Sequence, residues 1–377
     1  MARAKKGKKM VALAVSSYPA SGEKVGDSFL RNTSLRNVSF PNTSFPNTLP
    51  RIKIDVKDRK ILSTLDMDSR MPITVLAKEV GLSRQVVEYR LKRLKKEKVI
   101  FGSRAIFDSV VVGYTWYRVI FQLLSITQEE KKKLMDYLRN HPFTFWLGEV
   151  GGNWDFVVNF VCKDNFHFNS VFEEVITAYG QYIRNYEVLI YVHVTDLERD
   201  YLFPKKSGLR EVFVHAMTFN PDVQLDELDK KIISELSRDA DITNVDLANK
   251  YDVSANTIKN RINEMYKNKL LLGFRLFINP SVLGYSSHLL FLGVNRLDLE
   301  KEKELFSYLK SIHHVAFIVK HIGKWRIAAE VETKDSQEFQ DIFVEIRSKF
   351  ADIITDFEAL PLFKDHFIDY FPEGLLK

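Results

Sequence analysis

The strongest constraint on this 377-residue chain is an internal repeat at a fixed offset of 171 positions. The stretch KDRKILSTL, which begins at Lys57, aligns without a gap with LDKKIISEL one offset later. The same offset pairs Gly102 with Gly273, and it still holds where Trp154 meets Trp325. Register kept over about 130 residues indicates a duplicated unit. Whatever the first copy folds into, the chain should therefore contain it twice.

The first part of each copy has the pattern of three short helices. Ser83 can cap a helix that runs to Lys96, in which Val87, Leu91 and Leu94 form one apolar stripe at spacings of four and three. Gly81 marks a tight turn before this helix, and two other amphipathic helices precede the turn. Because an extended segment follows, we predict a winged helix-turn-helix.

The exposed face of this third helix is basic. From Arg84 to Lys98 the chain has seven Lys or Arg residues and two Glu. The first helix-turn-helix, Val56 to Phe107, has thirteen basic and six acidic residues, whereas residues 227–278 have nine and eight. Excess positive charge favours a polyanionic partner, and here it is concentrated in the first copy. For one such helix alone, a solvated charged face would be the simpler interpretation.

The second part of each copy predicts a βαββαβ domain, that is, a ferredoxin-like sandwich. Thr127 and Glu130 form a capping box at the start of one helix, and Phe168, Val171 and Val175 lie on one face of a second. The expected strands are residues 116–124, 143–150, 156–162 and 183–194. The fold class is therefore α+β, with two winged helix-turn-helix domains alternating with two sandwiches. One sheet face needs a cover, which the second copy can supply.

These patterns divide the chain into six segments. We expect a disordered basic tail over 1–54, helix-turn-helix domains over 55–113 and 225–284, sandwiches over 114–203 and 285–377, and a linker over 204–224. The tail is rich in Ser, Asn and Pro and has few apolar residues. It can add nonspecific attraction to nucleic acid, and an unselected extension is the alternative.

Composition argues against several classes of function. One cysteine, Cys162, excludes an internal disulfide and a Cys-based zinc site, and fits a cytoplasmic location. No apolar run approaches the roughly 18 residues of a membrane span. The nine histidines show no metal-ligand spacing, and no phosphate-binding loop or nucleophile motif occurs. We therefore expect no enzyme activity, metal, cofactor or membrane contact.

A winged helix-turn-helix followed by a βαββαβ domain resembles the Lrp/AsnC, or feast/famine, transcriptional regulators. The most typical stretch is LDELDKKIISELSRDADITNVDLANKYDVSANTIKNRI, from Leu225. The resemblance implies a regulator that binds double-stranded DNA sequence-specifically. It also implies sandwiches that pair through their sheets and bind small effectors, often amino acids, near the turn between the second and third strands.

The resemblance assigns candidate DNA contacts to the third helix of each module. In the first these are Ser83, Arg84, Gln85, Glu88, Tyr89, Lys92, Arg93, Lys95, Lys96 and Lys98. In the second they are Asn256, Lys259, Asn260, Asn263 and Lys267. Arg90 has its counterpart in Arg261, so a supporting role in the fold is an alternative to phosphate contact for Arg90. The reading faces differ between the copies, so we predict an asymmetric DNA site.

Candidate effector residues lie in the two corresponding turns. They are Gly152, Asn153 and Asp155 in the first copy, and Gly323, Lys324 and Arg326 in the second. Asp155 could accept an amino group, whereas Lys324 and Arg326 favour an anion or no ligand. Glycines that simply form the hairpin turns are the alternative explanation.

Two other functions stay open. Siroheme decarboxylases of alternative haem synthesis share this two-domain outline, and RAIFDSVVVGY, from Arg104, looks like their wing. A degenerate paralogue that only binds other proteins is the third reading. For the regulator, fusion of two units predicts an intrachain pseudo-dimer, on which larger homo-oligomers can build.

Overall fold

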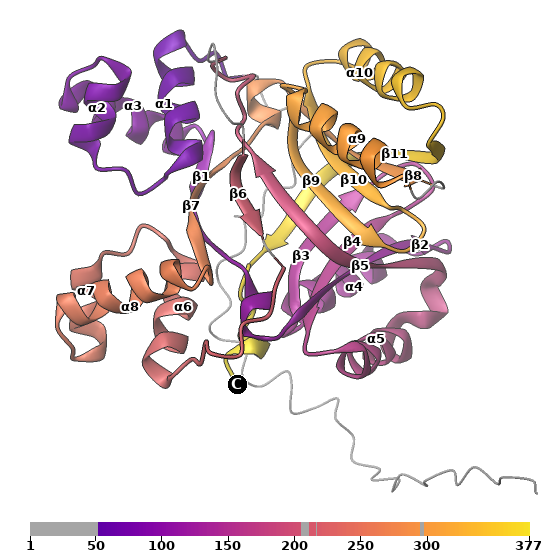
Figure 1. Ribbon diagram of the computed structural model, residues 1–377, viewed down its shortest axis with the longest axis horizontal. Coiled ribbons are helices and arrows are strands. Elements are labelled where there is room, and N and C mark those ends of the chain that lie inside the picture. The colour runs from indigo at the N-terminus through magenta and orange to yellow at the C-terminus, as the bar shows by residue number, and fades with distance from the viewer. Residues whose placement is uncertain (1–51, 205–210, 216, 295–297) are drawn as a thin grey trace, which may run out of the picture. The chain divides into compact units, whose positions relative to one another are not determined.

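The computed structural model describes residues 52–204, 211–215, 217–294 and 298–377. The prediction of a disordered tail falls almost entirely on residues 1–51 and so lies outside the described residues. Within the described part, two three-helix modules join a large β-sheet whose outer side carries four helices (Figure 1). The predicted α+β class, with each unit present twice, is confirmed.

Each helix-turn-helix begins with a capped helix. The first module consists of α1 (Val56–Met67), α2 (Ile73–Val80) and α3 (Arg84–Lys96). The second consists of α6 (Glu227–Arg238), α7 (Asn244–Tyr251) and α8 (Ala255–Lys267). Asp55 and Asp226 close capping boxes on α1 and α6, while Ser83 caps α3 through the Val86 backbone NH. Gly81 ends α2 in the left-handed region, with φ of 68°, which requires little strain only in glycine.

A two-stranded ribbon joins the two modules. Strands β1 (Ile100–Phe107) and β7 (Leu271–Ile278) pair antiparallel, and Arg104 lies opposite its repeat partner Arg275. The ribbon also ties the first module to the strand of the second copy, because the Ser69 backbone NH donates to the Phe274 carbonyl at 2.9 Å. The two modules are thus linked directly, and not only through the sandwiches.

The sandwiches follow the predicted βαββαβ order. The first consists of β2 (Thr115–Leu123), α4 (Gln128–Asn140), β3 (Thr144–Val150), β4 (Phe156–Cys162), α5 (Asn165–Tyr179) and β5 (Ile183–Leu197). The second consists of β8 (Ser286–Val294), α9 (Leu299–Ser311), β9 (Val315–Ile322), β10 (Ile327–Thr333), α10 (Ser336–Lys349) and β11 (Ile354–Ile368). Short 3-10 turns occupy Ser109–Val112, Gly180–Tyr182, Ser281–Leu283 and Glu373–Leu375.

The two four-stranded sheets join edge to edge and close into a barrel. The order β2-β4-β3-β11-β8-β10-β9-β5 returns to β2 through the β2–β5 pairing, so eight strands form a ring. The long strands β5 and β11 make this possible. Residues 183–190 of β5 pair with β2 and residues 190–196 pair with β9, while β11 pairs first with β8 and then with β3. The chain therefore builds the predicted pseudo-dimer within itself.

Alternate residues of the barrel strands face different cores. On β2, Val119 points outward and packs against helices α4 and α5, whereas Ile120 points into the barrel. Helices α9 and α10 cover the second half in the same way. Trp154 and Trp325, which are repeat partners, both lie inside the barrel. The second copy thus covers the inner sheet face of the first.

The segment expected to be a linker contains one further strand. β6 (Glu211–His215) pairs antiparallel with the far end of β5, where Val194 meets His215 and Asp196 meets Phe213. Within EVFVH, Phe213 and His215 are buried while Val214 is exposed. Buried and exposed side chains alternate over these five residues, as in a half-buried strand. A run of five residues is too short to be distinguished from a linker by sequence alone.

Candidate nucleic-acid interface

The face of α3 predicted to read DNA is open to solvent. Of its ten candidates, eight are exposed: Ser83, Arg84, Gln85, Tyr89, Lys92, Lys95, Lys96 and Lys98. Glu88 and Arg93 are partly buried. All five candidates on α8 are exposed. Val87 and Leu94, by contrast, are fully buried, so the packing of the apolar stripe fixes which side of the helix faces outward.

Several of the basic side chains on α3 have acidic partners. Arg84 Nε lies 2.7 Å from Glu88 Oε1 on the next turn. Lys95 Nζ lies 3.0 Å from Asp241 Oδ2, which belongs to the second module. Lys92, Lys96 and Lys98 make no ion pair with any described residue. These three lysines are therefore the most available cations for a phosphate backbone.

Arg90 and Arg93 hold the start of α1 instead of facing outward. One Arg90 guanidinium nitrogen, Nη1, lies 2.8 Å from carboxylate oxygens of both Asp55 and Asp58, and Arg93 also pairs with Asp58. The hydrogen bond from the Asp58 backbone NH lowers the pKa of Asp55 to about 2, with a further contribution from Arg90 and against a smaller opposing effect of burial. Arg261 repeats the arrangement in the second module, 2.7 Å from Asp226. In this structure Arg90 supports the fold of the first module, which is the alternative to phosphate contact given above.

The polar groups of the predicted effector turns make contacts within the chain. Asn153 Nδ2 donates to Glu358 at 2.9 Å, and Lys324 lies 3.6 Å from Glu187, the repeat partner of Glu358. The Asp155 carboxylate accepts the Leu123 backbone NH at 2.7 Å.

Other features of the turns are structural as well. Arg326 Nε lies 2.9 Å from Glu302. Gly152 and Gly323 both have positive φ, 90° and 139°, as hairpin glycines do. The polar side chains of these turns therefore already have partners on neighbouring strands or, for Arg326, on α9, and one Asp155 oxygen is occupied by the Leu123 NH.

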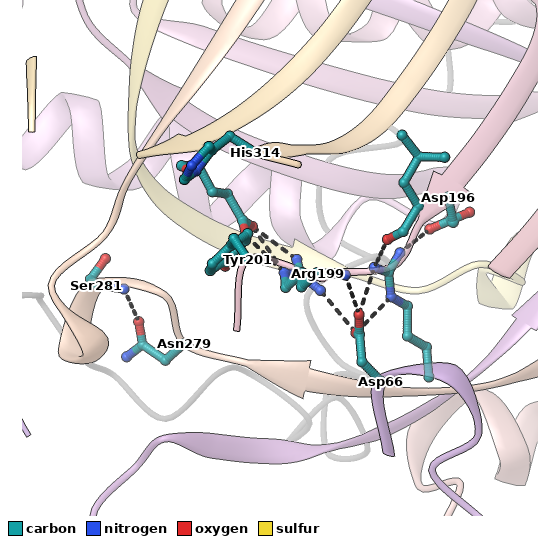
Figure 2. A network of polar contacts seen from close by, with 10 residues as sticks. Asp66, Asp196, Arg199, Tyr201, Asn279, Ser281 and His314 are labelled. Carbon is teal, nitrogen blue, oxygen red and sulfur yellow. Dashed lines mark hydrogen bonds and ion pairs between the residues drawn. The ribbon is translucent and has the colours of Figure 1, made fainter. Parts of the chain in front are cut away.

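Sequence reasoning missed a buried ionic network beneath the first module (Figure 2). Asp66, from α1, accepts Arg275 Nε at 3.1 Å and Arg199 Nη1 at 3.2 Å. Arg199 continues to Glu332 on β10 at 3.0 Å, while Arg275 Nη1 reaches Asp196 at 2.6 Å. The network therefore ties the first module to β5, β7 and β10 through charged groups that are almost wholly buried.

The charges in this network stabilise one another. Burial would raise the pKa of Asp66, but Arg275 and Arg199 hold it below its usual range. The amino-acid sequence contains one indication of this network. Asp66 directly follows the apolar stripe of α1, and its partner one offset later is Ser237. A charged residue that departs from its repeat partner at a core position indicates a contact made in one copy only.

The second module joins the barrel through apolar side chains. Ile232 and Leu236 of α6 belong to one continuous core with Phe107, Trp116 and Phe371. Phe107 and Phe371 meet edge to face, with ring centroids 5.8 Å apart. The core of the first module forms a separate cluster, which reaches only Tyr201, Leu202 and residues of the second copy near β7.

Three further observations on the described residues concern metal ligands, membrane-spanning helices and the one cysteine. In that part of the chain no three His, Cys, Asp or Glu side chains converge as a metal site would require. None of the helices described there is long and apolar enough to cross a membrane. Cys162 is buried, and burial raises the pKa of its thiol to about 12.

Comparison with known proteins fits this arrangement. The model of the AsnC-type helix-turn-helix domain matches residues 54–95 and 225–265. A proline dehydrogenase transcriptional activator from Rhizobium radiobacter is 34% identical over 128 residues, which are 33% of this chain and 81% of the relative. The HTH-type transcriptional regulator FL11 of Pyrococcus horikoshii is 26% identical over 120 residues, 32% of this chain and 78% of the relative.

One solved structure shares the whole fused architecture. The siroheme decarboxylase NirDL superposes with a TM-score of 0.55, covering 85% of this chain and 96% of its own, at 14% identity. That likeness concerns the fold. The AsnC-type helix-turn-helix model matches twice, at positions one repeat apart, and the Rhizobium activator is 34% identical over 81% of its own length. The chain therefore belongs to the Lrp/AsnC family, as a tandem duplication of its unit.

Proposed function

We propose that this protein binds double-stranded DNA through α3 and α8 and regulates transcription. The observation that carries the proposal is the orientation of α3, in which Val87 and Leu94 are buried while most polar and basic side chains of the opposite face are exposed. A helix presented in this way fits the major groove, and Lys92, Lys96 and Lys98 suit the phosphates beside it. Its regulator relatives support the same reading.

The two readers differ, so the preferred site should be an imperfect inverted repeat. Gln85 and Tyr89 on α3 are replaced by Asn256 and Asn260 on α8, and all four side chains are exposed. Asparagine pairs well with the adenine edge, and a good bidentate pair contributes roughly 1–3 kcal/mol of discrimination. Selection from random duplexes should return two unlike half-sites. A perfectly palindromic consensus would contradict this asymmetry.

Salt dependence tests the phosphate contacts. With about six phosphates neutralised, log K should fall against log salt with a slope near −5. Replacing Lys92, Lys96 and Lys98 with Ala should make the slope shallower by about 2–3. Lys132, Lys303 and Lys349 lie exposed on α4, α9 and α10, so their replacement with Ala makes a control of equal charge change. Equal losses in the two triple variants, or no duplex binding at low salt, would reject the proposal.

The fused barrel supports a monomer as the smallest stable species. Strand pairs β5–β9 and β3–β11 make within one chain the contacts that a pair of single units would make between chains. Light scattering should give about 44 kDa at low concentration, the mass of one chain being 43.9 kDa. An obligate dimer at nanomolar concentration would require a different account.

The fold likeness to NirDL makes siroheme decarboxylation the second candidate. An absorbance titration separates the two functions, because a bound tetrapyrrole shifts its Soret band. No shift at micromolar siroheme would remove the enzyme reading. A saturable shift with loss of carboxylate groups would establish it.

A further inference from the structure

A cavity of about 150 Å³ extends from the barrel interior to β7 and the loop that follows it. Its walls include Arg118 on β2, Asn159 on β4, Glu330 on β10 and Asn279 after β7. A volume of this size accommodates about one benzene-sized molecule. It lies apart from the predicted effector turns, none of whose residues line it.

The guanidinium of Arg118 enters this cavity without a counter-ion. Arg118 is 4% exposed, and no carboxylate of the described residues lies within 4.0 Å of its nitrogens. Its Nε donates to Asn159 Oδ1 at 3.0 Å and its Nη2 donates to the Tyr191 hydroxyl, which leaves Nη1 without a partner among the described residues. Buried charges in proteins are normally paired, since an unpaired one loses its hydration without compensation.

The groups packed around Arg118 do not neutralise it. Tyr191 is fully buried, and burial raises its pKa to about 12, so the hydroxyl keeps its proton. His321 is buried beside Tyr191, and burial followed by the nearby Arg118 charge holds its pKa well below the usual range. Trp146 and Phe291 present their rings at 5.9 Å. The cavity wall does contain charged side chains, but none of those described forms an ion pair with Arg118: Asp196, Arg199, Arg275, Glu332, Lys364 and Asp365.

Glu330 lines the same cavity as Arg118. It forms no ion pair or hydrogen bond with any described residue, although its charge acts on Arg118. Burial raises the pKa of Glu330 to about 8, and the negative charges of Glu332 and Asp365 raise it further. The positive charges of Arg199 and Arg275 lower it by a smaller amount. The raised pKa favours the protonated acid, which can donate a hydrogen bond and carries no charge to balance Arg118.

A second unpartnered group lines the end of the cavity near β7. Asn279 is 2% exposed, and its Oδ1 accepts the Ser281 backbone NH at 3.1 Å. Its Nδ2 has no hydrogen-bond partner in the described part of the chain. Two unused donors, one cationic and one neutral, thus meet one small cavity.

We propose that this barrel cavity binds a small organic monocarboxylate, whose two oxygens accept hydrogen bonds from Arg118 and from a second donor in the wall. A carboxylate supplies the charge that Arg118 lacks and fits the planar guanidinium. The aromatic and aliphatic walls, Trp146 and Leu289 among them, would enclose a short carbon chain. The inference does not depend on DNA binding, and its test uses the full chain without DNA.

Three probes of similar size separate the charge requirements: propionate, L-alanine and propylamine. Propionate at 10 mM should raise Tm by about 2–5 °C, because a ligand that binds only the folded state stabilises it. Propylamine should have no effect, and L-alanine should bind less tightly than propionate because its ammonium must also be desolvated. Stabilisation by propylamine, or tighter binding of L-alanine, would overturn the assignment.

Arg118→Leu is the decisive variant, since Leu289 holds the equivalent position of the second copy. The variant should keep its fold and lose the response to propionate in calorimetry and in Tm. Asn279→Ala retains the cation and tests whether Asn279 is the second donor, in which case binding should weaken about 3–10-fold. An unchanged propionate response in Arg118→Leu would reject the site, and the three probes test it independently if that variant fails to fold.

The pH dependence provides a further check. Glu330 is protonated below its pKa of about 8 and charged above it, where it repels a bound carboxylate and offers Arg118 an internal partner. Propionate affinity should therefore fall as pH rises from 7 to 9, and Glu330→Gln should abolish most of that fall. A pH-independent affinity in the unmodified protein would contradict the placement of the carboxylate beside Glu330.

Discussion

The two helix-turn-helix modules have the same topology but are attached to the rest of the protein by different sets of contacts. The first has a separate apolar cluster that reaches Tyr201 and Leu202, and in addition a buried carboxylate, Asp66, that pairs with Arg199 and Arg275. The second shares a continuous apolar core with the barrel, in which Phe107 packs against Phe371. Duplication has therefore preserved the inside of each module while the attachments have diverged.

The difference has consequences for stability. Replacing a whole buried ion network by apolar residues is often neutral or stabilising, but removal of a single partner leaves a buried charge uncompensated. An apolar attachment loses stability more gradually, according to the volume removed. The first module should thus be the more vulnerable to a single substitution, and the second the more tolerant.

The largest expected effect follows from breaking the ionic attachment. Asp66→Ala should lower the free energy of unfolding by about 3–5 kcal/mol, because Arg199 and Arg275 each lose a buried partner. Hydrogen exchange should increase in α1–α3 more than in α6–α8. The measurements are denaturant unfolding and exchange read by mass spectrometry.

The matched control is Ser237→Ala in the second copy. Ser237 stands one repeat after Asp66, is 4% exposed, and its hydroxyl has no partner among the described residues. Losing an unpaired hydroxyl should change stability little or raise it slightly. Equal destabilisation by the two substitutions would show that the modules are attached alike.

A smaller effect should come from the barrel interior, where Asn159 of the first copy corresponds to Glu330 of the second. The pKa of Glu330 is raised to about 8 in the folded protein, so the unfolded chain releases this proton at lower pH. Its contribution to stability is complete below about pH 4.5 and is lost as pH rises through 8. Glu330→Gln should thus raise stability at pH 8.5 by roughly 2–4 kcal/mol and change it little at pH 5. Thermal unfolding at the two pH values tests this, and an equal change at both would contradict it.

The smallest effect should distinguish the two equivalent arginines at the helix-turn-helix cores. The Arg90 side chain is 16% exposed and lies 2.8 Å from two carboxylates, whereas that of Arg261 is 39% exposed. Arg90→Ala should cost about 1–2 kcal/mol and Arg261→Ala less than about 1 kcal/mol, because exposed pairs are screened. Denaturant midpoints compare the two directly, and a larger loss for Arg261→Ala would reverse the ranking.

The helices and strands could be predicted because their signals are local. Ser83, Thr127 and the glycine at 81 each set an element boundary through their own side chain or backbone. The repeat then doubled every local prediction. The pseudo-dimer was also predictable, since each sheet had one apolar face without a cover.

What the sequence could not provide was how the sheets meet and what the barrel encloses. Closure depends on β5 and β11 each continuing past their own sheet onto the other, which no local periodicity encodes. Arg118 and Glu330 lie on different strands, 212 positions apart by their numbers, so their shared cavity appears only in three dimensions. The sequence does not distinguish Arg90 from the other basic residues of α3. Its ion pairs with Asp55 and Asp58 show that it supports the fold.

Closure of the eight-stranded ring also bears on how this protein coexists with its relatives. Regulators built from single units can exchange subunits wherever their sheet edges match. In a ring completed within one chain, the strands that such an exchange would use are already paired with each other. The two helix-turn-helix modules are therefore always present in equal numbers, because they belong to one chain.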